Sequence, residues 1–196
     1  MILPIVAYGD PVLKKRANPI HKNHPNLKQL IANMWDTMYA ANGVGIAAPQ
    51  IGESIRLFVV DGSPFADNPD LCPIEKKDLA SFKKVFINAE IHAYSGPQES
   101  FGEGCLSIPD IHEEVNRLST IEISYYNEKF ERIEEEISGL SARIVQHEYD
   151  HIEGILFTDK LGSLKKKLIK TKLTQISRGN ISPSYEMRFP NKTNLR

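Results

Sequence analysis

The chain has 196 residues, of which 41% are hydrophobic and 25% charged, and its formal net charge is −1. A chain of this length forms a domain that buries roughly 70% of its unfolded surface, so it needs no disulfide framework, and its two cysteines are too few to build one. The sequence has neither a run of about 18 apolar residues nor the basic start of a signal peptide, and we expect a soluble protein of a reducing cytosol.

An amphipathic helix is the first element that the sequence predicts. Pro25 opens a pattern in which apolar side chains recur at steps of three and four residues, and Gly43 closes it. The apolar positions are Leu27, Leu30, Ile31, Met34 and Met38. This spacing predicts a helix that packs against the core.

Strand patterns follow the helix. β-Branched and aromatic residues predict a buried strand over residues 54–61 and further strands over 83–91 and 119–127. The last of these alternates in polarity, as a half-exposed antiparallel strand does. Residues 62–81 contain three prolines and many charges, which indicates an excursion over the surface.

A second helix is predicted before Gly154, with Ser138 or Ser141 as its cap. One face of this helix carries Leu140, Ile144, His147 and His151. The order of helix, strands and helix predicts an α+β fold, with mostly antiparallel sheets packed around this second helix.

The last segment, residues 163–196, is strongly basic. It contains nine basic residues and one acidic residue, a charge of +8 that leaves −9 for residues 1–162. We interpret it as a basic C-terminal extension that follows a domain of residues 1–162. Such a cluster suits an anionic partner such as RNA or a ribosome, although a solvated helix face is the commoner reason for a run of charge.

The stretch QHEYDH, residues 146–151, places two histidines four positions apart on the second helix. Residues at this separation stack on one helix face, so His147 and His151 can direct ring nitrogens at a single ion. Glu148 is displaced to one side, where it can hold a proton for a water molecule that the metal activates. The alternative is a pair of core histidines that bond to backbone carbonyls. The buried helix face favours the metal site.

Two histidines bind an ion weakly, so a third ligand is expected. Phe157 occupies the position at which one protease class has a third histidine, and residues 161–184 contain no acid that could act as a ligand. The search therefore moves upstream. The upstream candidates are Cys72, His92, Cys105 and His112.

Cys105 is the preferred candidate for the third ligand. Gly102 and Gly104 let the backbone approach an ion closely, and Glu103 can support the loop. A thiolate with two imidazoles suits zinc or ferrous iron and leaves one position open for water, which indicates catalysis. The alternative is a closed structural site that also uses Cys72.

Three separated stretches together resemble one family. GVGIAAPQ at residues 43–50, EGCLS at 103–107 and QHEYDH at 146–151 occur in the order found in peptide deformylases. The resemblance covers roughly residues 1–162, which would then be the catalytic domain. It implies a metal-dependent hydrolase that removes the N-formyl group from nascent peptides beginning with formylmethionine and releases formate.

The resemblance also implies a role for each matched residue of the metal site. Cys105, His147 and His151 would be the metal ligands, and Glu148 would be the general acid and base. One divalent ion would be bound, Fe(II) in the cell, with Zn(II) or Ni(II) in isolated protein.

Further matched residues would contact the substrate. Gln50 and the backbone N–H of Leu106 would donate hydrogen bonds to the oxyanion, and Gly45 would line the channel for the substrate backbone. An apolar pocket is needed for the methionine side chain, and Val44 and Ile144 are our candidates for its wall.

The implied setting is the cytoplasm of a bacterium. The partners would be an N-formylmethionyl peptide and, through the basic extension, the ribosome, with neither DNA nor membrane as a partner. Two features depart from the family pattern: the excursion over residues 62–81 is longer than in compact members, and Arg143 stands where an apolar residue is expected. Both leave the finer substrate preference open.

Two other interpretations stay open. A metallopeptidase would activate water in the same way and would cleave unformylated peptides, although the missing downstream ligand argues against it. A non-enzymatic module with a structural metal would keep its fold when Glu148 is replaced and would show no hydrolytic activity.

Overall fold

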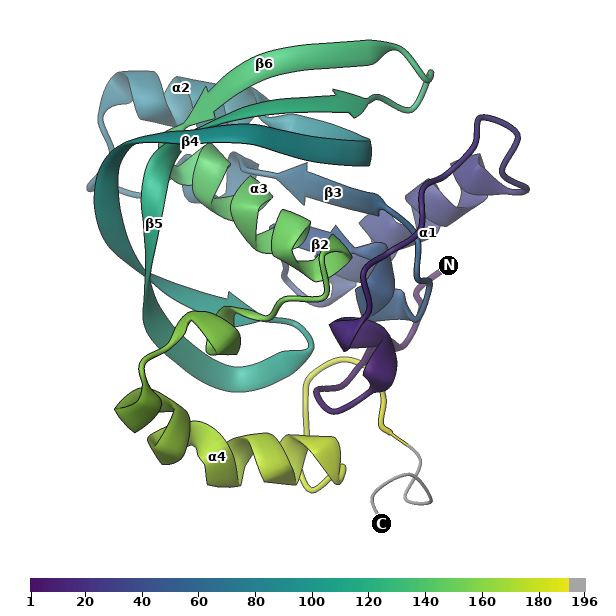
Figure 1. Cartoon of the computed structure of the whole chain (residues 1–196), viewed down its shortest axis with the longest axis vertical. Helices are drawn as coiled ribbons and strands as arrows, with labels where there is room; N and C mark the ends of the chain where they lie inside the picture. The colour runs from purple at the N-terminus through teal and green to yellow at the C-terminus, as the bar shows by residue number, and fades with distance from the viewer. Residues whose placement is uncertain (191–196) are drawn as a thin grey trace.

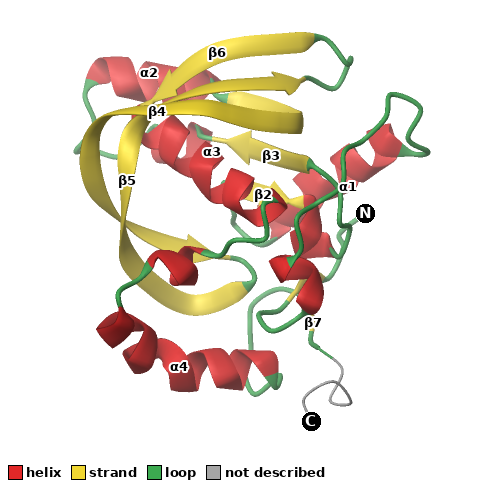
Figure 2. Cartoon of the chain, in the orientation of Figure 1, coloured by secondary structure: helices red, strands yellow, loops and turns green. Residues whose placement is uncertain are grey.

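A computed structural model of the protein describes residues 1–190, which form two sheets and four α-helices (Figures 1 and 2). The larger sheet is antiparallel, with the strands β2 (Gly45–Ala47), β3 (Leu57–Asp61), β4 (Lys83–Cys105), β5 (Ile108–Tyr126) and β6 (Arg132–Ser138) in that order. The smaller sheet pairs β1 (Ile5–Val6) with β7 (Met187–Arg188) in parallel. The helices are α1 (Leu27–Ala40), α2 (Pro73–Ser81), α3 (Gly139–Ile152) and α4 (Ser163–Ser177).

The strand β3 is buried on both faces because helices cover this part of the sheet from both sides. Successive strand side chains point to opposite faces. Leu57 and Val59 accordingly pack in one core cluster with residues of α1, whereas Phe58 and Val60 pack in a second cluster with residues of α3. The predicted α+β fold with an antiparallel sheet is therefore confirmed.

α1 and α3 begin close to the predicted positions. α1 starts at Leu27, after Asn26 in the left-handed region (φ 57°), and it buries the expected apolar face. α3 starts after Ser138, and Gly154, with φ 75°, follows its end. Figures 1 and 2 show α3 inside the curve of the large sheet, so both histidines of the QHEYDH stretch lie on an interior helix.

β4 and β5 are much longer than the strands predicted for these segments. They form one long antiparallel ribbon whose register shifts at four places, the last between Glu103 and Cys105. Such shifts bend and twist a ribbon. In Figure 1 the ribbon curves around α3, so its far end, with Cys105 and Ile108 paired, returns to the helix.

The surface excursion over residues 62–81 contains the short helix α2. Most of its side chains are exposed, and Leu79 is the residue of α2 that is buried. This segment is therefore attached to the body of the protein by a small apolar contact rather than by a core of its own.

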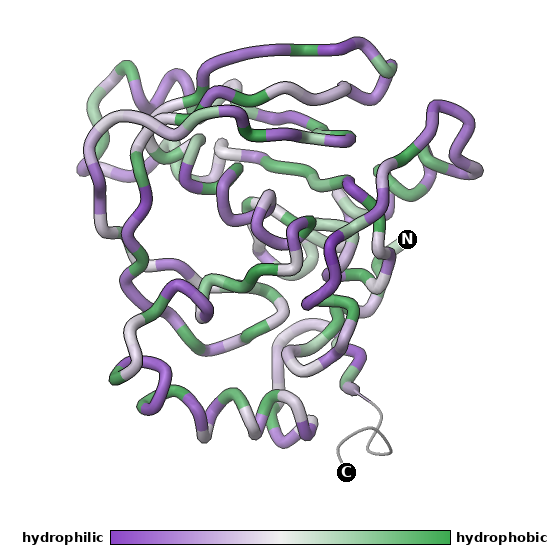
Figure 3. The backbone as a smooth tube through the Cα atoms, viewed as in Figure 1, coloured by the Kyte–Doolittle hydropathy of each residue, from purple (hydrophilic) through white to green (hydrophobic). Residues whose placement is uncertain are grey.

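The basic extension has two faces. α4 buries Ile169, Leu173 and Ile176 in the third core cluster, and Figure 3 shows hydrophilic residues recurring along the same helix. After α4 the chain returns to pair β7 with β1. Residues 191–196 of the predicted extension lie outside the described residues, and the division of the chain at residue 162 stays a prediction. Within residues 1–190, no helix is long and apolar enough to cross a membrane.

Candidate metal centre

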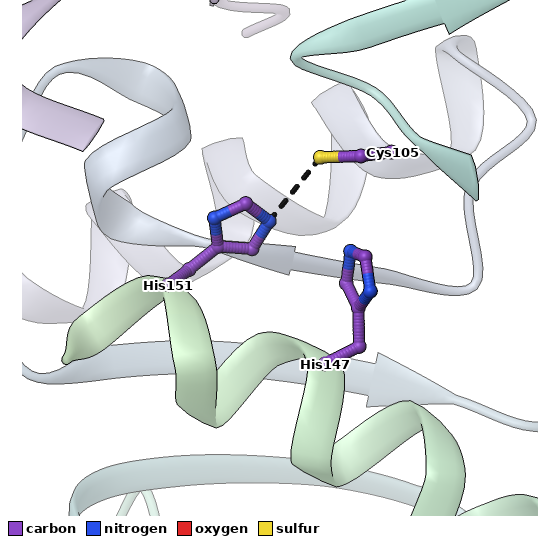
Figure 4. A group of neighbouring side chains, drawn as sticks. All are labelled: Cys105, His147 and His151. Carbon is purple, nitrogen blue, oxygen red and sulfur yellow. Dashed lines mark hydrogen bonds between the residues drawn. The ribbon is translucent and has the colours of Figure 1, made fainter. Parts of the chain in front are cut away.

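Three potential ligands from two distant segments meet at one place. His147 and His151 lie one turn apart on α3, and Cys105 is the last residue of β4 (Figure 4). One ligand atom from each residue lies within 4.8 Å of the others, and Cys105 Sγ is 3.2 Å from His151 Nε2. A thiolate with two imidazoles is a donor set that fits zinc or iron. The Nδ1 atom of His151 is buried without a hydrogen-bond partner among the described residues.

The other upstream candidates lie outside this group. Cys72 is exposed at the start of α2, and the ring of His92 contacts the hydroxyl of Ser124 at 2.7 Å. His112 lines the nearby cavity without joining the three potential ligands. In the described part of the chain, the group therefore offers three ligands, and an ion that takes four ligands would keep one position for water.

Glu148 is buried beside the three potential ligands. Its Oε2 atom has no hydrogen-bond partner in residues 1–190. Burial raises the pKa of the Glu148 carboxyl to about 7, although the nearby charge of His147 opposes this rise. A carboxyl group with such a pKa can accept and release a proton near neutral pH.

Gln50 is held with its amide group toward the site. It lies in the short helix Ala48–Ile51, and its Oε1 atom accepts a hydrogen bond from the backbone N–H of Ala47 at 2.7 Å. This bond leaves the amide nitrogen as a donor, and Nε2 lies 3.5 Å from Cys105 Sγ. The amide nitrogen of Gln50 can therefore donate a hydrogen bond to a group beside the three potential ligands.

A cavity of about 530 Å³ opens onto the site. Among the residues that line it are all five that we expected to contact substrate: Val44, Gly45, Gln50, Leu106 and Ile144. Its wall also includes Glu148 and His147, so the cavity joins a mainly apolar space to the polar centre.

Residues 2–167 match the family model described as polypeptide deformylase. The chain belongs to the polypeptide deformylase family. Membership makes it a hydrolase with deformylase activity in protein biosynthesis.

Curated relatives and solved structures agree with this assignment. The peptide deformylase of Christiangramia forsetii is 58% identical over the whole of both chains, and that of Flavobacterium johnsoniae is 56% identical over 96% of each chain. A crystal structure of a peptide deformylase from Legionella pneumophila is 36% identical, covers 92% of this chain and 98% of its own, and has a TM-score of 0.76. A crystal structure of the peptide deformylase from Thermotoga maritima is 40% identical, covers 83% of this chain and 99% of its own, and has a TM-score of 0.70.

In this deformylase, a buried cluster of charged side chains supports the candidate ligand His147. Glu103 accepts a hydrogen bond from His147 Nδ1 at 3.0 Å if that nitrogen carries the proton, and two more from Arg117 at 2.6 and 2.8 Å. Arg117 also donates to Asp150 at 2.7 Å. Because a carboxylate on the far nitrogen fixes the orientation and tautomer of a ligating histidine, Glu103 can orient His147 toward an ion.

From the sequence, Arg143 was expected to stand in place of an apolar residue near the pocket. In the structure its guanidinium instead forms hydrogen bonds within the protein. Its guanidinium donates to the backbone carbonyls of Val115 and Glu99 at 2.9 and 2.7 Å and to Glu103 at 3.1 Å. The side chain thus connects α3 to both strands of the long ribbon, and Arg143 is also among the residues that line the cavity.

No motif in the sequence singles out Arg117, Asp150 or Tyr185, although all three lie beside the site. The sequence did contain a pattern that points to the burial of Arg117, because Arg117 lies two positions after the apolar Val115 and so shares its face of the strand. The structure shows both residues buried. Asp150 lies within the QHEYDH stretch itself. Tyr185 lines the cavity from beyond residue 162, and its sequence surroundings contain no pattern that predicts this.

Proposed function

We propose that the protein removes the N-formyl group from nascent polypeptides that begin with formylmethionine and releases formate. The observation that carries this proposal is the meeting of Cys105, His147 and His151 beside the buried carboxyl of Glu148, at a cavity that Cys105, His147 and Glu148 line. These three residues would hold one divalent ion, Fe(II) in the cell and Zn(II) or Ni(II) in isolated protein. Such an ion activates a water molecule near neutral pH and polarises a carbonyl oxygen.

The residues around the ligands would carry the proton and the developing charge. Glu148 would take the proton from the attacking water and deliver it to the leaving amine, which its pKa of about 7 suits. The amide of Gln50 and the backbone N–H of Leu106 would donate to the formyl oxygen as it becomes an oxyanion. Gly45 would leave room for the peptide backbone.

The apolar part of the cavity would hold the methionine side chain. Val44 and Ile144 line it, and Val44 packs against the second core cluster, to which Ile144 belongs. A wall of this kind binds an unbranched apolar side chain by removing it from water. We place the reaction in the bacterial cytoplasm, where nascent chains emerge.

The decisive experiment measures formate release from formyl-Met-Ala-Ser by protein prepared without oxygen. We expect rapid release of formate and no cleavage of Met-Ala-Ser, the unformylated control. Cleavage of an internal peptide bond in the control would indicate a metallopeptidase instead. Absence of formate release from protein that contains a full equivalent of Fe(II) would refute the proposed activity.

Two substitutions separate metal binding from proton transfer. Glu148→Gln keeps the size of the side chain, and we expect full metal content with turnover lowered about 100-fold to 10,000-fold, the usual contribution of a general acid or base. Cys105→Ala removes the thiolate and is expected to lower metal content. Equal metal loss in both variants, measured by elemental analysis, would contradict this division of roles.

A further inference from the structure

The segment after α4 reaches the candidate metal centre although it lies beyond the part of the chain that matches the family model, residues 2–167. We call residues 178–190 the C-terminal strap. The strap runs beside the amino-terminal residues, as the yellow and purple parts of Figure 1 show. The N–H of Ile5 donates to Glu186 O, and the N–H of Ala7 donates to Arg188 O, both at 2.9 Å.

Within the strap, Tyr185 contacts the loop that carries the candidate ligand Cys105. Its hydroxyl donates a hydrogen bond of 2.7 Å to the backbone carbonyl of Leu106. Tyr185 also lines the same cavity as Glu148, and its ring packs against the first core cluster. One side chain therefore contacts both the hydrophobic core and the loop.

The loop between β4 and β5 depends on such contacts from outside. Cys105 pairs with Ile108, so Leu106 and Ser107 form a two-residue turn whose carbonyls are outside the ribbon ladder. The carbonyl of Ser107 accepts a bond from the backbone N–H of Tyr8 at 2.9 Å, and that of Leu106 accepts from Tyr185. Both donors come from segments that adjoin the small β1–β7 sheet.

We propose that Tyr185 is a positioning residue of the active site, which fixes the peptide groups of Leu106 through its hydroxyl. This inference rests on the proposed function, in which the N–H of Leu106 donates to the oxyanion. A donor that is held in place before the reaction costs no reorganisation in the transition state, so its orientation affects turnover more than ground-state binding. The strap is thus part of the catalytic structure, and not a tail attached to it.

The test uses Tyr185→Phe in the full chain, because this variant keeps the ring and removes only the hydroxyl. A single net hydrogen bond corresponds to a change of about fivefold to tenfold. We expect kcat for formyl-Met-Ala-Ser to fall by this factor while KM and metal content stay at the wild-type values. Tyr94→Phe on β4 is the matched control, because Tyr94 is 48% exposed and does not line the cavity, and it should behave as wild type.

A second measurement does not depend on catalysis. Amide hydrogen exchange of a peptide that contains Leu106 and Ser107 should be about fivefold faster in Tyr185→Phe than in wild type and in Tyr94→Phe. Wild-type exchange rates in Tyr185→Phe would overturn the proposal, even if the protein proved inactive on formylated peptides. If the protein is active, the proposal would also be overturned by an unchanged kcat in Tyr185→Phe, or by a change that is confined to KM or to metal content.

Discussion

At the scale of single residues, the stability of the metal centre depends on a carboxylate that is out of contact with water. The side chains of Glu103 and Arg117 are each 4% exposed, and Arg143 is buried against the same carboxylate. Removing one partner of a buried ion pair leaves an uncompensated charge, which costs far more than the loss of an exposed pair. Glu103 therefore affects both the fold and the orientation of His147.

Glu103→Gln tests this dependence. We expect the free energy of unfolding to fall by about 3 kcal/mol or more, because Arg117 and Arg143 keep their charges. Metal affinity should fall about tenfold or more, because His147 loses its carboxylate partner. Chemical denaturation and a competitive chelator titration measure the two effects. Glu134→Gln is the control: its pair with Arg132 is exposed, and it should change stability by about 1 kcal/mol at most.

The same carboxylate predicts a pH dependence of stability. Burial alone would raise the pKa of Glu103, but hydrogen bonds from Arg117 and His147 and the charge of Arg117 hold it well below the ordinary value of 4.5. The unfolded chain therefore binds a proton at a higher pH than the folded protein does. The stabilisation from Glu103 is complete above the unfolded pKa and is lost as the pH falls toward the folded pKa.

We accordingly expect the unfolding free energy of metal-free protein to fall between about pH 5 and pH 3, at up to about 1.4 kcal/mol per pH unit for each proton taken up. Denaturation curves recorded across this range check the prediction. The fall should be shallower in Glu103→Gln, and equal slopes in the two proteins would show that another group is responsible.

At the scale of elements, the close contact of β2 with α3 confines the proposed catalytic carboxyl. A Cβ atom at Gly45 would lie 2.5 Å from Glu148 Oε1 and 2.8 Å from its Cγ. Glu148 is buried, so a Cβ atom at residue 45 would displace its carboxyl group from the position that it occupies here. The close approach of β2 to α3 thus favours glycine at position 45, in addition to the proposed role of Gly45 in the substrate channel.

Gly45→Ala should displace the carboxyl of Glu148 and lower kcat by about 100-fold, since small misplacements of a catalytic group can have effects of this size. Metal content should stay near one equivalent, because the potential ligands lie elsewhere. Gly162→Ala is the control: a Cβ atom there would have no neighbour within 4 Å, and Gly162 does not line the cavity. Full activity in Gly45→Ala, measured by formate release, would contradict the proposed position of Glu148.

At the scale of the whole molecule, α4 and the C-terminal strap close the structure while the outer side of α4 remains basic. Ile169, Leu173 and Ile176 pack inward, whereas Lys167, Lys170 and Lys172 are exposed. Removing the whole extension would also remove the core contacts and the bond from Tyr185 to Leu106. The proposed contact with the ribosome is therefore tested more cleanly by changing charge alone.

We expect replacement of Lys167, Lys170 and Lys172 by Gln to weaken co-sedimentation with ribosomes most at low ionic strength. The difference from wild type should shrink as the salt concentration rises, because salt weakens the lysine–phosphate contacts that only the wild type makes. Formate release from a short peptide should stay at the wild-type rate. Replacement of Lys76 and Lys77 on α2, which are distant in sequence and also lie on a surface helix, is the control. Undiminished co-sedimentation of the triple variant would contradict a role for this face.

The sequence by itself determined the class of fold and the chemistry of the centre. Steps of three and four residues predicted α1 and α3, and the spacing of His147, Glu148 and His151 predicted two ligands and a base on one helix. These are local properties, since the periodicity of a helix decides which side chains share a face. The glycines beside Cys105 made it the preferred third ligand among four upstream candidates, whereas the roles of Gln50 and Leu106 needed the family resemblance, because no local rule relates segments that far apart.

Only the tertiary structure decided which distant groups meet. The four register shifts bend the β4–β5 ribbon so that Cys105 returns to α3, and the burial of Arg117 and Asp150 places charge where it supports His147. The path of the strap from α4 to β1 brings Tyr185 to Leu106, 79 positions away in the chain. Such contacts depend on the curvature of a sheet and on the packing of side chains from several elements, which a one-dimensional pattern of residues does not encode.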